Sequence, residues 1–226
     1  MFIPLRDENP TSRFPVVTIA LIAVNAVVFL FQAVAPQSLE LTAVRVGAVP
    51  FAITHFRSLP EAAAFPPLLT LLTSMFVHGS LFHLFGNMLY LWIFGNNIED
   101  RLGPIRFSLF YLVCGVVAAL THILFQPGSR IPMIGASGAI AGVLGAYWTL
   151  FPRARVKVFI FLIFYIDVVA IPAGIVLGLW FLLQLLNVGI GGGVAWFAHV
   201  GGFLAGLLLI RLAPRPALPR AIWRES

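Results

Sequence analysis

Four polar residues in otherwise apolar parts of this sequence have the side chains that hydrolysis of an acyl group requires: His83, Asn87, Ser137 and His199. A serine hydroxyl becomes a strong nucleophile when a neighbouring base takes its proton, and imidazole titrates close enough to neutral pH to be that base. The N–H groups of His83 and Asn87 could stabilise the negative oxygen of a tetrahedral intermediate. These residue types predict acyl transfer to water, with Ser137 as nucleophile and His199 as general base.

The composition of the chain places these residues in a membrane protein. Of the 226 residues, 60% are hydrophobic and 10% are charged, whereas a soluble domain has about 45–50% apolar and about 25% charged residues. The chain therefore has too little polar surface for a soluble globular fold. The single cysteine, Cys114, excludes a disulfide framework and a cysteine-based zinc site. The 14 Lys and Arg residues are scattered between apolar blocks, which argues against a nucleic-acid partner.

Six apolar stretches without Lys or Arg are long enough to cross a bilayer, which takes about 20 residues at about 1.5 Å per residue. They are Phe14–Ala35, Leu81–Ile98, Phe107–Phe125, Gly135–Phe151, Ala170–Asn187 and Val194–Ile210. We therefore predict an all-α membrane protein, a compact bundle of six transmembrane helices that forms a single domain over residues 1–226. Its core would span about residues 14–212, between a short polar segment at 1–13 and a basic tail at 213–226.

The positions of the basic residues predict how the bundle is oriented. With the N-terminus inside, eleven of the 14 Lys and Arg residues fall in inner segments. Only Arg45, Arg57 and Arg130 fall in outer segments. Because loops on the cytoplasmic side carry the excess of Lys and Arg, we expect both termini to be cytoplasmic.

Two connections are unusual for a plain helical bundle. The first outer loop, Pro36–Pro67, is long and apolar, which favours short helices or a hairpin on the outer surface of the membrane. The segment Val156–Asn187 is too long for a single crossing as a straight helix. We expect its first third to bend along the inner surface, with Pro172 near the entry to the true span.

This topology places the four polar residues in one layer of the membrane. Each lies within about seven positions of the outer end of its span, which is about 10 Å along a helix. Two G-x-x-x-G pairs would let the fourth and sixth helices pack closely and bring Ser137 towards His199. The pairs are Gly138 with Gly142 and Gly202 with Gly206. No acidic residue falls in this layer, since Asp167 would lie about 30 Å away along the fifth helix, so we expect a Ser–His dyad.

Three short motifs make the chain resemble the rhomboid intramembrane serine proteases of the bacterial six-helix type. They are G-x-S-G at residues 135–138, A-H-x-G-G at residues 198–202 and H-x-x-x-N at residues 83–87. The resemblance implies Ser137 as nucleophile, His199 as general base, and His83 and Asn87 as oxyanion residues. It further implies cleavage of transmembrane segments of other membrane proteins without metal or cofactor, in a cell membrane that would be the bacterial inner membrane. Ala141 stands where some members carry a tyrosine that stacks on the histidine.

Other interpretations of these residues remain open. Taken singly, Ser137 could ease helix packing, and His199 could be a satisfied buried histidine or part of a proton path. His83 and Asn87 together could bond between helices. The whole chain could be a catalytically silent relative that binds membrane clients, or a small transporter, although the inverted halves typical of transporters are not visible. We expect His78 to cap a helix at the membrane surface and His122 to be interfacial or to pack. Trp196 and Trp223 are expected as interfacial anchors.

Overall fold

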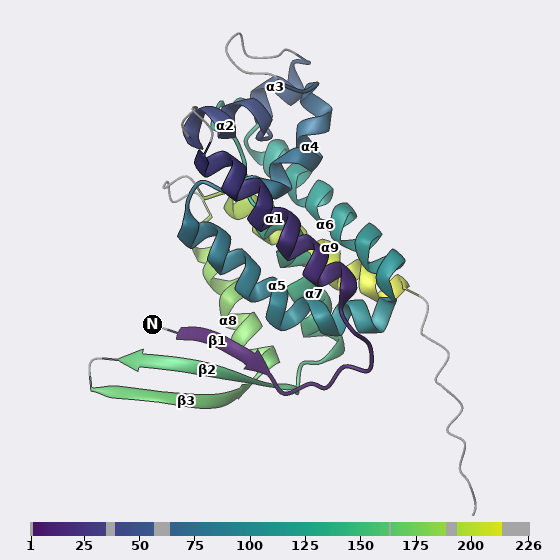
Figure 1. Cartoon of the computed structure of the whole chain (residues 1–226), viewed down its shortest axis with the longest axis vertical. Coiled ribbons are helices and arrows are strands. Elements are labelled where there is room, and N and C mark those ends of the chain that lie inside the picture. The colour runs from purple at the N-terminus through teal and green to yellow at the C-terminus, as the bar shows by residue number, and fades with distance from the viewer. Residues whose placement is uncertain (1, 35–38, 57–63, 163, 189–193, 214–226) are drawn as a thin grey trace, which may run out of the picture.

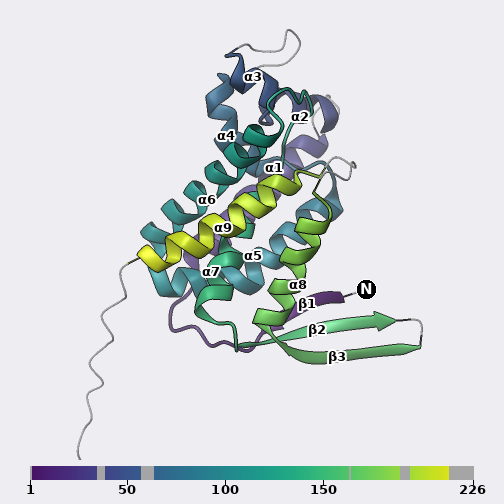
Figure 2. The same ribbon diagram turned by 180° about the vertical axis from the view of Figure 1, so that it is seen from behind.

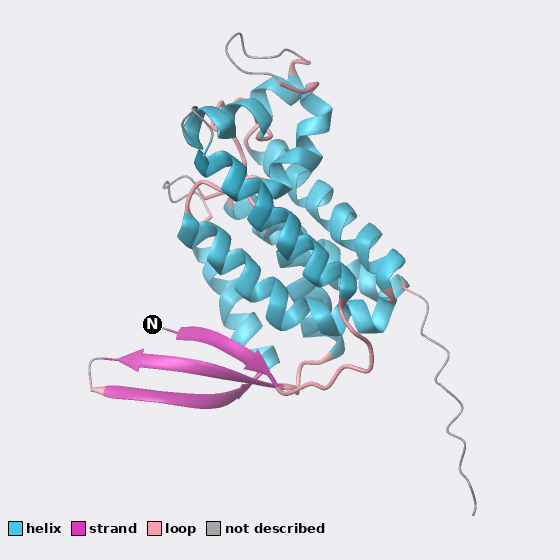
Figure 3. Ribbon diagram, viewed as in Figure 1, coloured by secondary structure: helices cyan, strands magenta, loops and turns pink. Residues whose placement is uncertain are grey.

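Helices account for most of the described chain, and a small β-sheet lies across one end of them (Figure 3). The computed structural model describes residues 2–34, 39–56, 64–162, 164–188 and 194–213. The expected tail at 213–226 and Trp223 within it therefore lie outside the described residues, apart from Ala213. The predominantly helical character predicted from the apolar stretches is confirmed.

Each of the six predicted stretches contains one helix in the described part of the chain (Figure 1). These helices are α1 (Val16–Val34), α5 (Leu81–Leu102), α6 (Pro104–Phe125), α7 (Ser137–Leu150), α8 (Ala173–Leu186) and α9 (Trp196–Leu212). Of the described helices, α1 and α6 are by themselves long and apolar enough to cross a membrane, and α5 qualifies together with Pro67–Phe76 across an 80° bend. Because α7, α8 and α9 are shorter apolar helices, the number of crossings stays a prediction.

The long loop after α1 contains short helices, one of the two forms expected for it. These are α2 (Leu39–Val46), α3 (Pro50–Thr54) and α4 (Thr70–Thr73), with 3-10 turns at Pro67–Leu69 and Ser74–Phe76. The loop is tied to the segment before α7 by a pair of backbone hydrogen bonds between Ala48 and Met133, of 3.0 and 2.8 Å. The short helices thus form a layer at the end of the bundle where α5, α7 and α9 begin, in contact with α1 and α6 (Figure 1).

The all-α expectation is wrong at the opposite end, where described residues form a three-stranded antiparallel sheet in the order β1-β2-β3. Its strands are β1 (Phe2–Asp7), β2 (Arg155–Leu162) and β3 (Tyr165–Pro172). The segment expected to bend along the membrane surface before the fifth helix is therefore a β-hairpin. The reason is local: β2 alternates basic or aromatic with β-branched residues, a pattern that suits a strand with one buried face. The helix entry expected near Pro172 is confirmed, since α8 begins at Ala173 with Pro172 as its N-cap.

The core of the bundle is α7, whose residues Ala139 to Tyr147 are all buried (Figure 2). It packs closely against α9 because two α9 glycines let the backbones of the two helices touch. A Cβ built on Gly202 would overlap the carbonyl oxygen of Gly138, and one on Gly206 would overlap that of Gly142. The close approach predicted from the glycine spacing is confirmed, since any larger side chain at these positions would push the two backbones apart.

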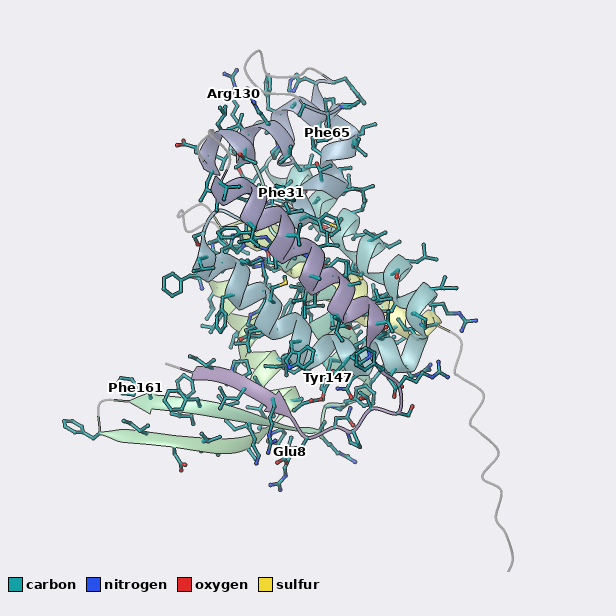
Figure 4. All side chains as sticks on the ribbon, in the orientation of Figure 1. Glu8, Phe31, Phe65, Arg130, Tyr147 and Phe161 are labelled. Carbon is teal, nitrogen blue, oxygen red and sulfur yellow. The ribbon has the colours of Figure 1, made fainter. Side chains whose placement is uncertain are left out.

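The far end of α7 is anchored to the sheet through a buried polar contact. The hydroxyl of Tyr147 donates to Oδ2 of Asp7 at 2.7 Å, and Nδ2 of Asn97 donates to the same oxygen at 2.7 Å. Burial raises the pKa of the Asp7 carboxyl, although both hydrogen bonds favour its charged form. Strand β1 is thereby held against the end of α5 and, through the Tyr147 hydroxyl, against the end of α7. Figure 4 shows Tyr147 close to the end of this strand.

A carboxylate on α5 caps the start of α1. Glu99 accepts the backbone N–H groups of Val17 and Thr18 at 2.8 and 2.7 Å, and the Thr18 hydroxyl at 2.8 Å. The first N–H groups of a helix have no partner within it, and leaving them buried without an acceptor is costly. Negative charge is also favourable at a helix N-terminus. Glu99 therefore joins α1 to α5 and also provides hydrogen-bond acceptors for the first N–H groups of α1.

We expect Glu99→Ala to destabilise the protein strongly, because it leaves two N–H groups and a hydroxyl buried without an acceptor. Each unsatisfied group costs about 1–3 kcal/mol, so the loss should be on the order of several kcal/mol in the free energy of unfolding. Denaturant unfolding in detergent micelles measures it. Asp100→Ala is the matched control, since Asp100 accepts from Ser12 at an exposed site. Equal stability of the two variants would contradict the capping role.

Candidate active site

Ser137 and His199, predicted from their spans to be neighbours, are brought into hydrogen-bonding contact. The Oγ of Ser137 lies 2.8 Å from Nε2 of His199. Ser137 is the first residue of α7, and His199 lies in the first turn of α9. The contact follows directly from the glycine-mediated packing of these two helices, because both residues stand at the ends of the helices that meet under the short-helix layer.

A residue that the sequence analysis missed, Gln184 of α8, holds the other side of the imidazole. Its Oε1 lies 2.7 Å from Nδ1 of His199, and its Nε2 donates to the carbonyl oxygen of Trp180 at 3.2 Å. A carbonyl oxygen can only accept a hydrogen bond, so the group of Gln184 that faces Trp180 must be the amide nitrogen. The amide oxygen of Gln184 therefore faces the imidazole ring. Nδ1 must then carry the hydrogen, which leaves Nε2 free to accept from the serine hydroxyl.

The signal for Gln184 was present in the sequence. It is a polar residue within the apolar stretch Ala170–Asn187, and the rule that singled out the other four residues applies equally to it. The expectation of a Ser–His dyad rests on the absence of acidic residues from this layer and overlooks neutral amides. In the structure, the amide of Gln184 stands where a carboxylate would complete a triad.

Two tryptophans pack against the imidazole from different sides. The ring of Trp180 is tilted by 37° to that of His199, and the ring of Trp196 meets it edge-on at 90°, each with centroids 6.0 Å apart. Trp196, expected as an interfacial anchor, thus contacts the candidate base. Ala141, which stands where some rhomboid proteases carry a stacking tyrosine, is fully buried in the core.

His83 and Asn87 face the backbone that precedes Ser137. Gly135 has φ of +111°, and a Cβ there would lie 2.7 Å from Cε1 and Nε2 of His83 and 3.5 Å from Nδ2 of Asn87. Only glycine satisfies both the conformation and the space. The structure therefore brings all four predicted residues to one place.

His78 is not the interfacial cap that was expected, because its side chain is fully buried. Its Nε2 lies 2.9 Å from Nδ2 of Asn87, and Gln32 of α1 bonds to both its backbone N–H and its carbonyl, at 3.2 and 3.3 Å. His78 therefore orients the Asn87 amide. His122 is half-buried and meets Phe197 edge-on at 6.2 Å, in keeping with the expected packing role.

A cavity of about 780 Å³ opens over these groups. It is lined by Ser137, His199, His83 and Asn87, and also by Trp180 and Gln184. Its walls come from the beginnings of α5, α7 and α9, the ends of α6 and α8, and the segment before α7. The arrangement combines a hydroxyl, a base, N–H donors and space for another molecule.

Comparison with known proteins is consistent with this geometry. The Rhomboid domain model matches residues 67–215. Rhomboid protein 1, mitochondrial, of Saccharomyces cerevisiae is 31% identical over 149 residues, which cover 62% of this chain and 40% of the relative. Presenilin-associated rhomboid-like protein, mitochondrial, of Mus musculus is 33% identical over 195 residues, covering 84% of this chain and 46% of the relative. RHOMBOID-like protein 1 of Arabidopsis thaliana is 34% identical over 146 residues, covering 62% and 33%.

The chain spans less than half the length of these relatives. All three come from eukaryotes, and two are named as mitochondrial. The bacterial inner membrane expected from the resemblance therefore stays a prediction, as does the bacterial subtype.

The role of Gln184 can be tested without any substrate. We expect ¹⁵N NMR of histidine-labelled protein to show His199 protonated at Nδ1 and unprotonated at Nε2. Gln184→Leu should remove this preference, because it removes the acceptor at Nδ1. Gln126→Leu, which changes another glutamine lining the cavity, is the control. The assignment is wrong if the His199 signals are the same in the wild type and in Gln184→Leu.

Proposed function

The chain belongs to the rhomboid family, and on that premise we propose that it is an intramembrane serine endopeptidase that hydrolyses peptide bonds in or near transmembrane segments of other membrane proteins. Ser137 is the nucleophile and His199 the general base. The observation that carries the proposal is the 2.8 Å contact between Ser137 Oγ and His199 Nε2 at the wall of a cavity. A serine that only eased helix packing would need neither the oriented imidazole nor the open space.

The reaction proceeds in two balanced halves. Nε2 of His199 takes the hydroxyl proton as Oγ of Ser137 bonds to the substrate carbonyl carbon, and then gives that proton to the leaving amine as the peptide C–N bond breaks. A water molecule attacks the resulting ester, again losing its proton to Nε2, and the acid product leaves with Oγ reprotonated. The amide oxygen of Gln184 accepts the Nδ1 hydrogen throughout, which keeps the ring oriented through both proton transfers.

The negative oxygen of each tetrahedral intermediate is stabilised from two directions. One N–H of the Asn87 amide is held by His78, which leaves the second N–H free to donate. His83 lies against Gly135, beside the same backbone turn. The N-terminus of α7, where the nucleophile stands, adds backbone N–H groups without partners in the helix and the positive end of the helix dipole.

The membrane arrangement of the proposal follows from the sequence. Six helices cross the membrane, both termini are cytoplasmic, and the site lies towards the outer surface. The substrates are membrane-embedded proteins, and the bilayer is the medium in which they meet the enzyme. Residues 1–226 act as one domain with its core at about 14–212.

Labelling with a fluorophosphonate probe tests the nucleophile. We expect the wild type to be labelled and both Ser137→Ala and His199→Ala to lose the label, because the first removes the attacking oxygen and the second its base. Ser129→Ala, which removes another hydroxyl lining the cavity, should be labelled normally. A folded wild type that is not labelled and does not cleave a single-span substrate would favour the catalytically silent alternative.

The oxyanion role of Asn87 has a separate test. Loss of one such donor typically lowers turnover by about 10²–10³, so Asn87→Ala should lower kcat by up to this factor and leave KM nearly unchanged. Steady-state cleavage of a single-span substrate in nanodiscs measures both constants. The matched control is Asn96→Ala, which removes an amide near the other end of the same helix. An effect confined to KM would mean that Asn87 positions the substrate.

A further inference from the structure

The β2–β3 hairpin carries an uncovered apolar surface, which we call the hairpin tip and define as Phe159, Phe161, Phe164, Ile166 and Val168. Phe159 is paired with Val168 and Phe161 with Ile166, so these four side chains share one face of the sheet. Phe161 is 47% exposed, Val168 46%, Ile166 64% and Phe164, in the turn between the strands, 99%. Clustered exposed aromatic and β-branched residues of this kind mark an interaction site.

The opposite face of the same sheet is covered by the protein. Val156, Val158 and Ile160 alternate with the tip residues along β2 and are buried in one core cluster with Ala173 and Leu177 of α8. The pleat therefore turns one set of apolar residues into the bundle and the other set away from it. Within the described chain nothing explains why the second set is apolar as well.

The uncovered face changes character along its length. Towards the root of the hairpin, the register places Arg6 of β1 opposite Lys157, and Arg155 lies two residues before Lys157 on the same face. Lys157 pairs with Glu8 at 3.4 Å, and in the described residues no acidic side chain pairs with Arg6 or Arg155. Asp167, the acidic residue of β3, is paired with Ile160 and so belongs to the other face. The face is thus apolar at its tip and cationic at its root.

The hairpin also lies where lipid is close by. In Figures 1 and 2 it leaves the bundle beyond α8, and Figure 4 shows Phe161 towards the tip and Glu8 towards the root. Strand β3 continues into α8 without a linker, and α8 exposes Ile175, Leu179 and Leu183, a surface suited to acyl chains. The hairpin is therefore joined directly to a helix whose exposed side chains are apolar.

We propose that the hairpin tip inserts into the interface of the membrane leaflet at the end of the bundle remote from Ser137, and that Arg6 and Arg155 bind anionic lipid headgroups there. Aromatic and aliphatic residues flanked by cations bind in this way to the boundary between headgroups and acyl chains. A soluble partner would not be expected to match an apolar tip joined directly to a lipid-facing helix. The insertion braces the start of α8, whose other end carries Gln184.

Site-specific fluorescence in lipid nanodiscs that hold one copy of the protein tests this proposal. In a Cys114→Ala background, Phe164→Cys and Ile166→Cys are each labelled with a polarity-sensitive dye, and Arg153→Cys, in the exposed turn before β2, is the matched control. In discs of phosphatidylcholine with phosphatidylglycerol, we expect acyl-chain spin labels to quench the dye at 164 and 166 and aqueous iodide to quench the dye at 153. Changing Arg6 and Arg155 to Gln should weaken the lipid quenching at 164.

Each other outcome overturns the proposal. If iodide quenches the dye at 164 as readily as the dye at 153, the tip lies in water. If neither quencher reaches the dye at 164, protein covers the tip. If shielding appears only when two copies share a disc, the occupant is a second copy paired along the edge strand β3. Equal lipid quenching with and without phosphatidylglycerol would remove the headgroup part of the proposal.

Discussion

The close contact between the backbones of α7 and α9 fixes the arrangement on which the rest of the structure depends. Gly202 and Gly206 of α9 lie against the carbonyl groups of Gly138 and Gly142 of α7, with no room for a Cβ on either α9 glycine. In lipid, apolar side chains gain little by leaving the surrounding acyl chains, so helices associate through close backbone packing and buried hydrogen bonds. The Ser137–His199 contact stands at the end of this glycine seam and exists because the seam is so narrow.

Around the seam, each buried polar side chain of the site is held by another element. The amide of Gln184 bridges α8 to the imidazole, and His78 links Asn87 to Gln32 on α1. At the other end, Glu99 caps α1 and Asp7 receives Tyr147. Because water is scarce inside a membrane protein, unsatisfied polar groups there are expensive, so these pairings help to fix which helices pack together.

The two ends of the bundle serve different physical purposes. At one end the helices begin around a cavity, under a layer of short helices that includes α2 and α3. At the other, strands from residues 2–7 and 155–172 close the bundle and join α7 to α8. The hairpin stands where a long surface helix was expected and runs directly into α8, the helix that carries Gln184 near its other end.

The sequence by itself determined the helices and the candidates for chemistry. Long apolar stretches and the cost of polar groups within them locate α1, α5, α6, α7, α8 and α9 to within a few residues. Because successive spans run in opposite directions, their polar residues could also be placed in one layer. Both inferences depend on local composition and on helix geometry, and both of these can be obtained from consecutive residues of the sequence.

Only the tertiary structure determined which side chains form hydrogen bonds with one another and which strands pair. Gln184 meets His199, Asn87 meets His78, and β1 pairs with a strand more than a hundred residues further along the chain. The strands were not predicted because a short apolar segment is compatible with either a buried helix or a strand. The choice depends on whether another strand is available to pair with it. Hydrogen-bond partners distant in sequence are chosen by the packing of whole helices, and no local pattern of residues carries that information.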